Sequence, residues 1–486
     1  MPRILTNILR FGLTFAVLVL LFHLGMYLVC LPSSDGIYAH AKESYTTIKA
    51  QGGRPKLFAQ LGIANDNYTD ALIVNELSSV DSTEPFISYM KVRKNFRRGQ
   101  TEVVLHDILG RAACAYYLEP SAFETFNDWY NDQEHLRGGQ ISELGLFLEG
   151  YIDISVEYGR YWHGYLVVFR PLFFFLNISV VRWLTLALFI ALYALFLRLL
   201  DRRFGRTIAI IYGASLLFEG YFSVAFSLQG SLVFLVSIVS AILLLKRIDS
   251  ICHIHLYFFV LGCLINYVDY LTVPLVSLGL LQALYLLKIN DDNKSWQSGL
   301  FFLATSALAW LLGYAGTFLA KWVSYDIFIN DGPGMVYTGL QQFFFRTSGE
   351  YVYYSPFDRS HLYLAVVFLG HATLFSLLTT GFILYRQRFA LPALRGFSPR
   401  LLGFMCIAMY PLVWYQLLAT HVTTHHYFAY RMALLYMLGF LLAWHELFYP
   451  THLNNRMQIA PAQVASSSPS APDEQLQQGD DSMNRI

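Results

Sequence analysis

Charged residues are scarce in this chain of 486 residues, because Lys, Arg, Asp and Glu together make up only 14% of it. A soluble domain contains roughly 25% charged residues. Hydrophobic residues reach 55%, and the mean hydropathy is +0.43. This composition excludes an ordinary soluble enzyme. It also excludes a disordered chain, which would be poor in apolar residues.

Signatures of nucleic-acid, zinc and nucleotide binding are also missing. The net charge is only +1, so no excess of basic residues is available to bind nucleic acid. The five cysteines are scattered, and no two have the spacing of a zinc site or a redox motif. Neither a Walker A loop nor a Rossmann glycine fingerprint occurs in its proper context, which argues against a nucleotide donor.

Long apolar runs dominate the sequence instead. A hydrocarbon core of ~30 Å requires roughly 20 apolar residues per helix. About ten runs approach that length, at residues 8–31, 179–200, 207–228, 230–247, 254–272, 274–288, 297–320, 361–385, 401–419 and 432–449. The sequence therefore predicts an all-α polytopic membrane protein with about ten transmembrane helices.

Two of these runs depart from the usual pattern. The run at 8–31 resembles a secretory signal, but it is too long and has no obvious small-residue cleavage site. We therefore expect a retained signal anchor. The run at 274–288 is short for a full span, so a tilted or partly re-entrant helix is expected there.

Basic residues indicate the orientation of the spans. They occur before or at the start of the first run and after the second, fourth, sixth and eighth, at Arg3, Arg10, Arg198, Arg202, Arg203, Arg206, Lys246, Arg247, Lys288, Lys294, Arg386, Arg388, Arg395 and Arg400. With ten spans, all of them fall on one side. Cytoplasmic loops are rich in Lys and Arg, so that side and both termini are predicted to be cytoplasmic.

This topology divides the chain into four segments. Residues 1–31 form the signal-anchor helix, and residues 32–178 form a large periplasmic loop with interfacial helices. Residues 179–449 form the helix bundle, which includes a second outer loop at 324–360. The tail at 450–486 is rich in Ser, Pro and Gln, so we expect it to be disordered in the cytoplasm.

The large outer loop has its own helical pattern. Apolar periodicity predicts short helices packed on the membrane surface at Tyr68–Ser79, Phe86–Val92 and Ile141–Ile154. The apolar stretch Trp162–Asn177 is interrupted by Arg170 and Pro171. Because Pro breaks a helix interior, this stretch is interpreted as an interfacial helix that leads into the second span.

Ionisable side chains gather near the predicted outer ends of the spans. A charge at the centre of a span costs roughly 2.5–3.5 kcal/mol, so such residues need a partner or a function. The candidates are Asp70, Asp153, Glu157, His163, Asp269, Lys321, Arg346, His425 and Arg431. Cations can bind a phosphate, and a carboxylate can accept a hydroxyl proton. The set therefore favours an outward-facing site.

Several of these residues also have a purely structural interpretation. Asp70 can cap the helix that follows it, and Asp269 can pair with Lys321 or another basic residue. His163 can belong to an aromatic belt, and Arg431 can extend from the start of a span to the interface.

The overall layout resembles the GT-C superfamily of membrane glycosyltransferases. These enzymes have many spans and a large outer loop between the first two. An acidic residue in that loop is a recurrent catalytic feature, and Asp70 in NYTDALIVNEL is the best match. Asp153 and Glu157 are candidates for a second acid.

Three other segments contribute to the resemblance. The passage Arg160–Arg182 (RYWHGYLVVFRPLFFFLNISVVR) resembles the loop exit of the superfamily, with His163 and Arg182 in the corresponding places. The segments INYVDYLTVP and THHYFAYR resemble patterns in bacterial membrane proteins of this architecture. A narrower similarity, based on size and span count, is to bacterial arabinofuranosyltransferases such as the enzyme that modifies type IV pilins.

The resemblance implies a function and roles for the candidate residues. The donor would be a sugar on polyprenyl phosphate, and the acceptor a hydroxyl of a periplasmic protein or glycan at the bacterial inner membrane. Asp70 would be the general base. The donor phosphate would be held by Lys321, Arg346 and Arg431 with His163 and His425, while Asp269 would orient a cation or contact the sugar.

No cofactor is firmly expected, and a divalent cation is left open. The first outer loop lacks the tandem Asp-Asp or Asp-x-Asp of the superfamily and has Asp66 and Asp70 four residues apart instead. His421 and His425 would share a helical face and are spaced to bind a metal. Without an HExxH motif or an adjacent acid, however, we do not expect a zinc site.

Two other functions are compatible with the same composition. A transporter or flippase for a lipid-linked sugar could use the buried ions as a relay, but the sequence shows no inverted repeat. A polysaccharide polymerase or ligase would also pair outer Arg and His residues with a lipid-linked donor. Its major outer loop is expected late in the chain, where only 324–360 is available.

Overall fold

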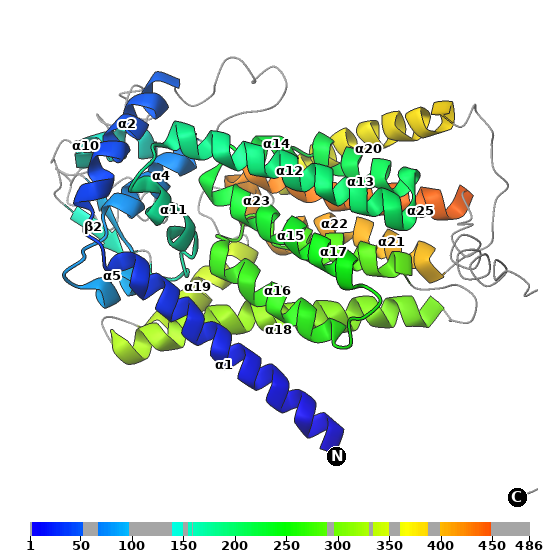
Figure 1. The fold of residues 1–486 in the computed structure, drawn as a ribbon, viewed down its shortest axis with the longest axis horizontal. Coiled ribbons are helices and arrows are strands. Elements are labelled where there is room, and N and C mark those ends of the chain that lie inside the picture. The colour runs from blue at the N-terminus through cyan, green and yellow to red at the C-terminus, as the bar shows by residue number, and fades with distance from the viewer. Residues whose placement is uncertain are drawn as a thin grey trace, which may run out of the picture.

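Long helices run side by side through most of the molecule, and short helices gather at one end of them (Figure 1). The computed structural model describes residues 2–51, 67–96, 139–148, 154–157, 159–288, 296–329, 334–348, 360–386 and 399–448. Within these residues the chain is helical, apart from one antiparallel pair of short strands. The predicted all-α class is therefore confirmed except for this pair.

The long helices form a bundle. Its elements are α1 (Pro2–Cys30), α12 (Ile178–Phe204), α13 (Arg206–Phe218), α14 (Tyr221–Val224), α15 (Leu228–Arg247), α16 (Ile254–Val268), α17 (Leu275–Lys288), α18 (Trp296–Phe328), α19 (Met335–Ser348), α20 (Ser360–Arg386), α21 (Pro399–Ala408), α22 (Tyr410–Leu417), α23 (Ala419–Thr424), α24 (His426–Ala429), the 3₁₀ turn η2 (Tyr430–Met432) and α25 (Ala433–Phe448).

Among the described residues, five helices are long and apolar enough to cross a membrane. They are Leu5–Cys30, Ile178–Phe204, Leu228–Arg247, Gln297–Phe328 and Leu364–Tyr385. Three further apolar helices are shorter, at Arg206–Phe218, Ile254–Val268 and Leu275–Lys288. These lengths and compositions are those of a membrane-embedded protein.

Two of the apolar runs are broken for local reasons. Helix α13 ends at Phe218, and Gly220 follows with a φ of +87°, a left-handed conformation that glycine adopts without steric cost. The run at 401–419 is divided between α21 and α22, because Pro411 in the first turn of α22 has no amide hydrogen to donate to the preceding turn.

The short helices of the outer segment form a cap over one end of the bundle (Figure 1). The cap consists of α2 (Asp35–Gln51), α4 (Asn67–Ser78), α5 (Pro85–Lys91), β1 (Arg93–Phe96), α10 (Gly139–Leu148), β2 (Ile154–Glu157) and α11 (Tyr165–Phe173). Helices α4, α5 and α10 overlap the three stretches that apolar periodicity marked, each beginning one or two residues earlier, whereas α2 was not predicted. The tail at 450–486 lies outside the described residues.

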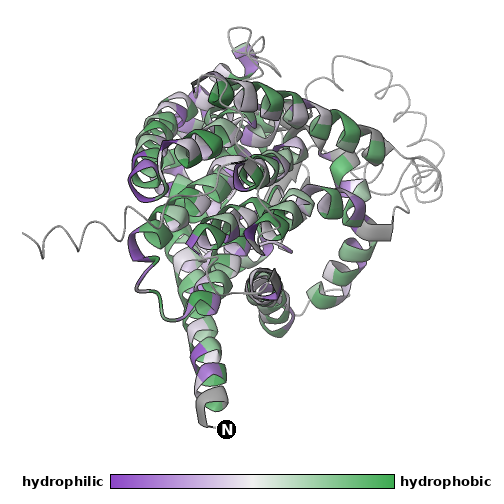
Figure 2. Cartoon of the chain, turned by 90° about the vertical axis from the view of Figure 1, so that its right-hand side faces the viewer, coloured by the Kyte–Doolittle hydropathy of each residue, from purple (hydrophilic) through white to green (hydrophobic). Residues whose placement is uncertain are grey.

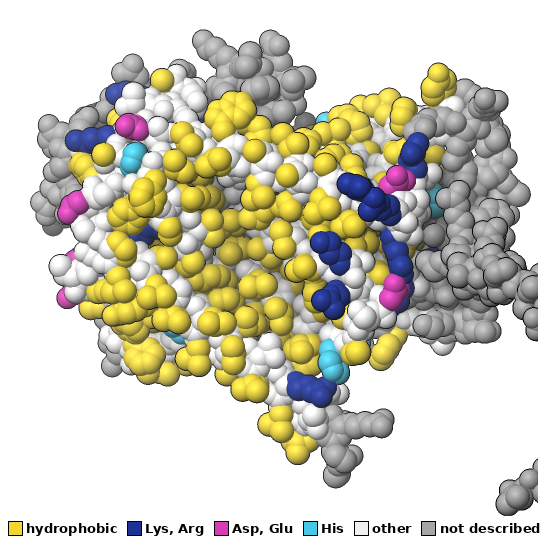
Figure 3. Space-filling model, in the orientation of Figure 1, with side chains coloured by type: hydrophobic (Ala, Val, Ile, Leu, Met, Phe, Trp, Pro, Cys, Tyr) yellow, Lys and Arg dark blue, Asp and Glu magenta, His cyan; other side chains and the backbone are white. Residues whose placement is uncertain are grey.

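Basic side chains gather at the end of the bundle opposite the cap, beside a broad apolar surface (Figure 3). The last turns of α12, α15 and α17 supply Arg202, Arg203, Lys246, Arg247 and Lys288. Viewed toward this end, the first half of α1 projects away from the other helices (Figure 2). The helix ends that are rich in basic residues thus lie at one end of the bundle, and the cap lies at the other.

Glycines allow one pair of bundle helices to pack unusually closely. A Cβ atom on Gly262 of α16 would lie 2.1 Å from the carbonyl oxygen of Trp310 in α18. A Cβ atom on Gly313 would lie equally close, at 2.1 Å, to the carbonyl oxygen of Phe259. Backbone contact through small residues is typical of membrane helices, where van der Waals packing drives helix association.

A single buried arginine ties the cap to the first span. Arg170 of α11 is fully buried, and its Nε donates to the carbonyl oxygen of Val29 at 2.6 Å. Its Nη1 donates to the carbonyl oxygen of Leu77 at 2.6 Å, and its Nη2 to that of Pro32 at 2.5 Å. One guanidinium therefore joins the ends of α1 and α4 to α11. The five N–H donors of Arg suit this role.

Replacing Arg170 with Met is expected to lower the free energy of unfolding by about 3 kcal/mol or more, because it leaves three buried carbonyl oxygens without donors. The measurement is the thermal unfolding midpoint of the detergent-purified protein. The matched control is Arg198→Met, which changes an exposed arginine of α12. Equal midpoints for the two variants would contradict this role of Arg170.

Candidate functional site

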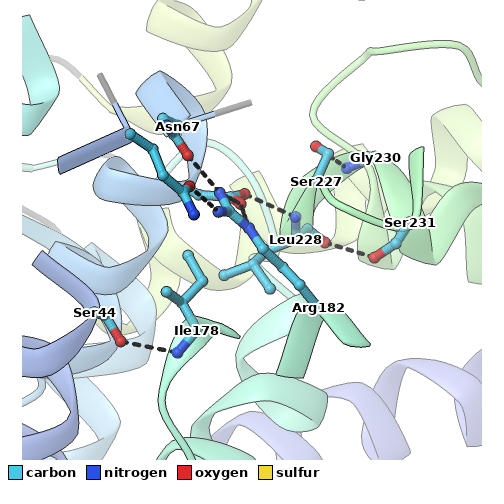
Figure 4. Close-up of polar contacts among 10 residues, drawn as sticks. Ser44, Asn67, Ile178, Arg182, Ser227, Leu228, Gly230 and Ser231 are labelled. Atoms are coloured by element: carbon cyan, nitrogen blue, oxygen red, sulfur yellow. Dashed lines mark hydrogen bonds and ion pairs between the residues drawn. The ribbon is translucent and has the colours of Figure 1, made fainter. Parts of the chain in front are cut away.

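Asp70, the expected general base, is held in a buried ion pair. It lies in the first turn of α4, and its Oδ2 accepts from Arg182 Nη2 at 2.6 Å and Nε at 3.0 Å (Figure 4). Its Oδ1 accepts from the backbone N–H of Leu228 at 2.8 Å, at the start of α15. Arg182 also donates to Asn67 Oδ1 at 2.8 Å. Both carboxylate oxygens are thus engaged in joining the cap to α12 and α15.

The cation beside Asp70 is not one of those that the resemblance assigned to the donor phosphate. Among the described residues, Asp70 forms its ion pair with Arg182 and not with Lys321, Arg346 or Arg431. Asn177 and Ser227 cap the starts of α12 and α15, where the Asp70–Arg182 pair attaches, by accepting from Val180 and Gly230. The pair therefore lies at a well-defined junction of three helices.

Lys321 serves as another tie between cap and bundle. It is fully buried in α18, and its Nζ donates to the carbonyl oxygens of Tyr89 at 3.0 Å and Met90 at 3.2 Å. The ammonium also lies 5.7 Å from the ring centre of Trp162, within cation–π range. Its hydrogen-bond acceptors include two carbonyl oxygens of α5. Lys321 therefore does not pair with Asp269 as its structural interpretation suggested.

Arg431 lies on η2, beside a cavity of about 10 Å³. Ser227, Gln229 and Thr272 share the lining of that cavity, which has room for about one water molecule. The guanidinium carbon of Arg431 is 5.0 Å from the ring centre of Tyr430. The cavity beside Arg431 is therefore small and largely enclosed, and apolar side chains such as Phe234 and Val273 line it together with the polar ones.

Four buried side chains form a hydrogen-bonded cluster between the cap and the bundle, which we call the Glu76 cluster. It consists of Glu76, His163, Tyr165 and Tyr270. Tyr270 donates its hydroxyl to Glu76 Oε2 at 2.9 Å, and His163 Nδ1 is 2.7 Å from the Tyr165 hydroxyl. His163 Nδ1 is also 3.5 Å from Glu76 Oε2. The Tyr165 hydroxyl contacts both Glu76 and Tyr270.

Aromatic rings extend this cluster toward Arg346 of α19. The Tyr161 ring meets the Tyr270 ring edge-on, with centroids 5.0 Å apart. The guanidinium carbon of Arg346 lies 5.7 Å from the Tyr161 ring centre. Arg346 is half-buried, so solvent screens its charge only in part.

Asp269, just after α16, has one carboxylate oxygen engaged and the other unpaired. Oδ1 accepts from Thr272 N at 2.9 Å and Thr272 Oγ1 at 2.5 Å. Oδ2 is buried and has no hydrogen-bond partner among the described residues. The buried hydroxyl of Tyr314 in α18 interacts with Asp269 without the geometry of a standard hydrogen bond, and Arg346 acts on the same hydroxyl. An acid and a base therefore lie near the same tyrosine.

Two histidines complete the site: His421 of α23 and His425, the residue that follows this helix. His421 Nε2 donates to the carbonyl oxygen of Leu271 at 2.8 Å, two residues after Asp269. Its ring lies 4.7 Å from that of His425. Burial, followed by the positive charges of His425 and Arg346, holds the pKa of His421 well below its usual range. His421 is therefore neutral, and its buried Nδ1, without a hydrogen-bond partner among the described residues, keeps its lone pair.

The structure brings together some of the expected residues and separates others. His163, Asp269, Arg346 and His425 belong to one continuous group, which we call the outer site. Arg431 adjoins this group, because its cavity is also lined by Thr272, which binds Asp269, and by Phe428, which stacks on His425. Asp70 and Lys321 have the partners given above. Asp153 lies outside the described residues. Glu157 is the last residue of β2 and pairs with Arg93 of β1.

The outer site also contains residues that the candidate set omitted: Glu76, Tyr161, Tyr165, Tyr270, Tyr314 and His421. Three of the tyrosines are within two residues of His163 or Asp269 in the sequence, and that adjacency is the one signal that could have identified them. Glu76 is six residues after Asp70 on the same helix, but nothing in the sequence indicates which of the two acids faces the bundle.

The chemistry of the outer site is that of acids, bases and aromatic faces. Among the described residues, no group of three or more His, Cys, Asp or Glu is arranged to hold a metal ion. Arg346 and His425 can bind an anionic group, and Asp269 Oδ2 can accept a proton. The tyrosine rings and hydroxyls can contact a polar ring such as a sugar.

Comparison with known proteins gives no assignment for this chain. No protein-family model matches the chain, and neither a curated protein nor a solved structure matches it.

Proposed function

We propose that this chain is a membrane glycosyltransferase that uses a polyprenyl-phosphate sugar as donor. The acceptor is a hydroxyl of a periplasmic protein or glycan, and the resemblance to pilin-modifying enzymes favours arabinofuranose as the sugar. One observation carries the proposal: an acid, cations and aromatic rings from the first outer segment and from later loops converge at the cap end of the bundle.

The proposed topology has ten spans, in a bacterial inner membrane. In support of it, the ten apolar runs each contain a helix or a pair of helices, and the basic helix ends lie opposite the cap. The positive-inside rule then assigns the basic end and both termini to the cytoplasm. The cap and the outer site would face the periplasm, where the lipid-linked donor and the acceptor meet.

In the proposed reaction, the acceptor hydroxyl attacks the anomeric carbon of the donor sugar. The bond between that carbon and the phosphate oxygen breaks, and polyprenyl phosphate leaves with the bonding electron pair. The acceptor proton passes to a carboxylate. Arg346, with His425, would stabilise the negative charge that develops on the phosphate. Tyr161 and Tyr314 would offer a ring face and a hydroxyl to the sugar.

Asp269 is the general base that the geometry favours. Its Oδ2 has no hydrogen-bond partner among the described residues, so a lone pair is available for the proton. Thr272 holds the other oxygen and thereby fixes the direction of the carboxylate. The two oxygens of Asp70 already accept from Arg182 and Leu228, so proton uptake there would break a buried ion pair.

Replacing Asp269 with Asn is expected to slow sugar transfer by about 10²–10⁴-fold, which is the usual contribution of a general base. Asn keeps the oxygen that accepts from Thr272, so the local fold is retained. The assay supplies a labelled polyprenyl-phosphate sugar and measures both labelled acceptor and free polyprenyl phosphate.

The control for this experiment is Asp201→Asn, an exposed acid at the opposite end of the bundle. A folded Asp269→Asn protein with the normal transfer rate would exclude Asp269 as the base. A wild-type protein that moves the donor across the membrane without releasing polyprenyl phosphate would exclude the transferase and favour the transporter.

Asp70→Asn is expected to act mainly on stability. It leaves the buried guanidinium of Arg182 without its counter-charge, which should cost about 3–5 kcal/mol of unfolding free energy. Activity per folded molecule should stay within a few-fold of normal. A double-mutant cycle with Arg182→Gln, read by thermal unfolding in detergent, measures the coupling. Unchanged stability with abolished transfer would return the role of base to Asp70.

A further inference from the structure

An apolar groove lies between α12, α13 and α20, away from the outer site. Its volume is about 700 Å³, a size typical of ligand pockets. Leu197 of α12, Ala214 of α13 and Leu378 of α20 contribute to its walls. Leu378 is 57% exposed, and Leu217, which also lines the groove, is 47% exposed. In a bilayer the groove would therefore open to lipid.

The two ends of the groove are different. Toward the cap, the lining includes Phe218 of α13, whose ring stacks on Phe375 of α20 with centroids 4.3 Å apart and an interplanar angle of 9°. At the other end, Arg198, Asp201 and Arg206 line the groove. A molecule can therefore place a polar group at the basic end, with its apolar part directed toward the middle of the membrane.

The charge at the basic end is positive and available to a ligand. Arg198 and Arg206 are exposed, and one acid, Asp201, lies between them. Asp201 Oδ1 is 4.0 Å from Arg206 Nε, and an exposed pair at that distance is weak. Arg203 has its own partner, Asp249 Oδ1 at 2.5 Å, so it does not compete for Asp201.

The length of the groove matches one leaflet. It follows α13, whose 13 residues extend about 20 Å. Half of a hydrocarbon core is about 15 Å. An acyl chain of the leaflet at the basic end can therefore fill the groove while its headgroup stays at the interface.

We propose that this groove binds an anionic phospholipid of the cytoplasmic leaflet. An acyl chain lies between α12, α13 and α20, and the phosphate contacts Arg198 and Arg206. Basic pockets between helices on the cytoplasmic side are suited to anionic headgroups. This site is separate from the outer site, because no residue of the outer site lines the groove.

The test measures the affinity of the detergent-purified, full-length protein for phosphatidylglycerol and phosphatidylcholine by native mass spectrometry. Wild-type protein should prefer phosphatidylglycerol by at least about 10-fold. The double variant Arg198→Gln with Arg206→Gln should bind phosphatidylglycerol about 30-fold more weakly, given the usual contribution of a basic residue near an anionic surface. The charge-preserving double variant Arg198→Lys with Arg206→Lys should retain binding.

Two further variants make the test specific to the groove. Ala214→Phe fills the groove without changing charge, and it should also abolish the preference for phosphatidylglycerol. Lys246→Gln with Arg247→Gln removes two exposed charges from the same end of the bundle, away from the groove, and should leave binding unchanged. Equal binding of the two lipids, equal losses in both glutamine double variants, or normal binding by a folded Ala214→Phe protein would each overturn the proposal.

Discussion

Buried charge at the junction of cap and bundle constrains the rest of the structure. Arg182 and Asp70 come from segments 112 residues apart, and they meet in a site that excludes water. Removing a charged group from water costs several kcal/mol, so each can be buried only if its partner arrives in the correct geometry. The backbone N–H of Leu228 satisfies the second oxygen of Asp70 and thereby requires α15 to begin at that point. Arg170 imposes a similar condition on the ends of α1 and α4. The position of the cap over the bundle follows from these requirements.

A cap held in this way determines which side chains face the bundle. Asp70 and Glu76 are on the same short helix, but the first is turned toward α12 and α15, while the second contacts Tyr165 and Tyr270. The stabilising acid and the acid of the outer site are thus separated by less than two turns of helix. His163 and the segment after α16 are brought to the same place, because the backbone N–H of Gly164 donates to the carbonyl oxygen of Tyr267 at 2.9 Å. The polar groups of the outer site therefore depend on the junction without being part of it.

The sequence predicted the helices well, because an apolar run in a membrane has few structural options. Backbone polar groups in lipid must be paired within the segment, so runs such as 179–200 become helices like α12 almost regardless of their partners. Breaks within runs were harder to predict, since Gly220 and Pro411 act through local backbone geometry. The candidate site was predicted by residue type but not by pairing. Charge in an apolar context identified Asp70, Asp269 and Arg346 alike. Whether a charge is balanced by an ion pair depends on contacts between distant residues, 112 positions apart for Asp70 and Arg182, which composition and periodicity do not encode.

Backbone strain gives an independent reason to separate the outer site from the stabilising pairs. Among the described residues, three non-glycine residues have a positive φ, which such residues seldom adopt: Val92 at the end of α5 (+38°), His163 (+56°) and Leu271 (+69°). Each such residue costs of order 1–3 kcal/mol and persists only where the surrounding structure enforces it. His163 belongs to the Glu76 cluster, and the carbonyl group of Leu271 accepts from His421. Two of the three strained residues thus adjoin the segment that carries Asp269, whose Oδ2 has no standard hydrogen bond among the described residues. Strain and an unpaired carboxylate oxygen both reduce stability, and a fold retains them together where they hold reactive groups in position. The Asp70–Arg182 pair stabilises the same fold and has neither feature.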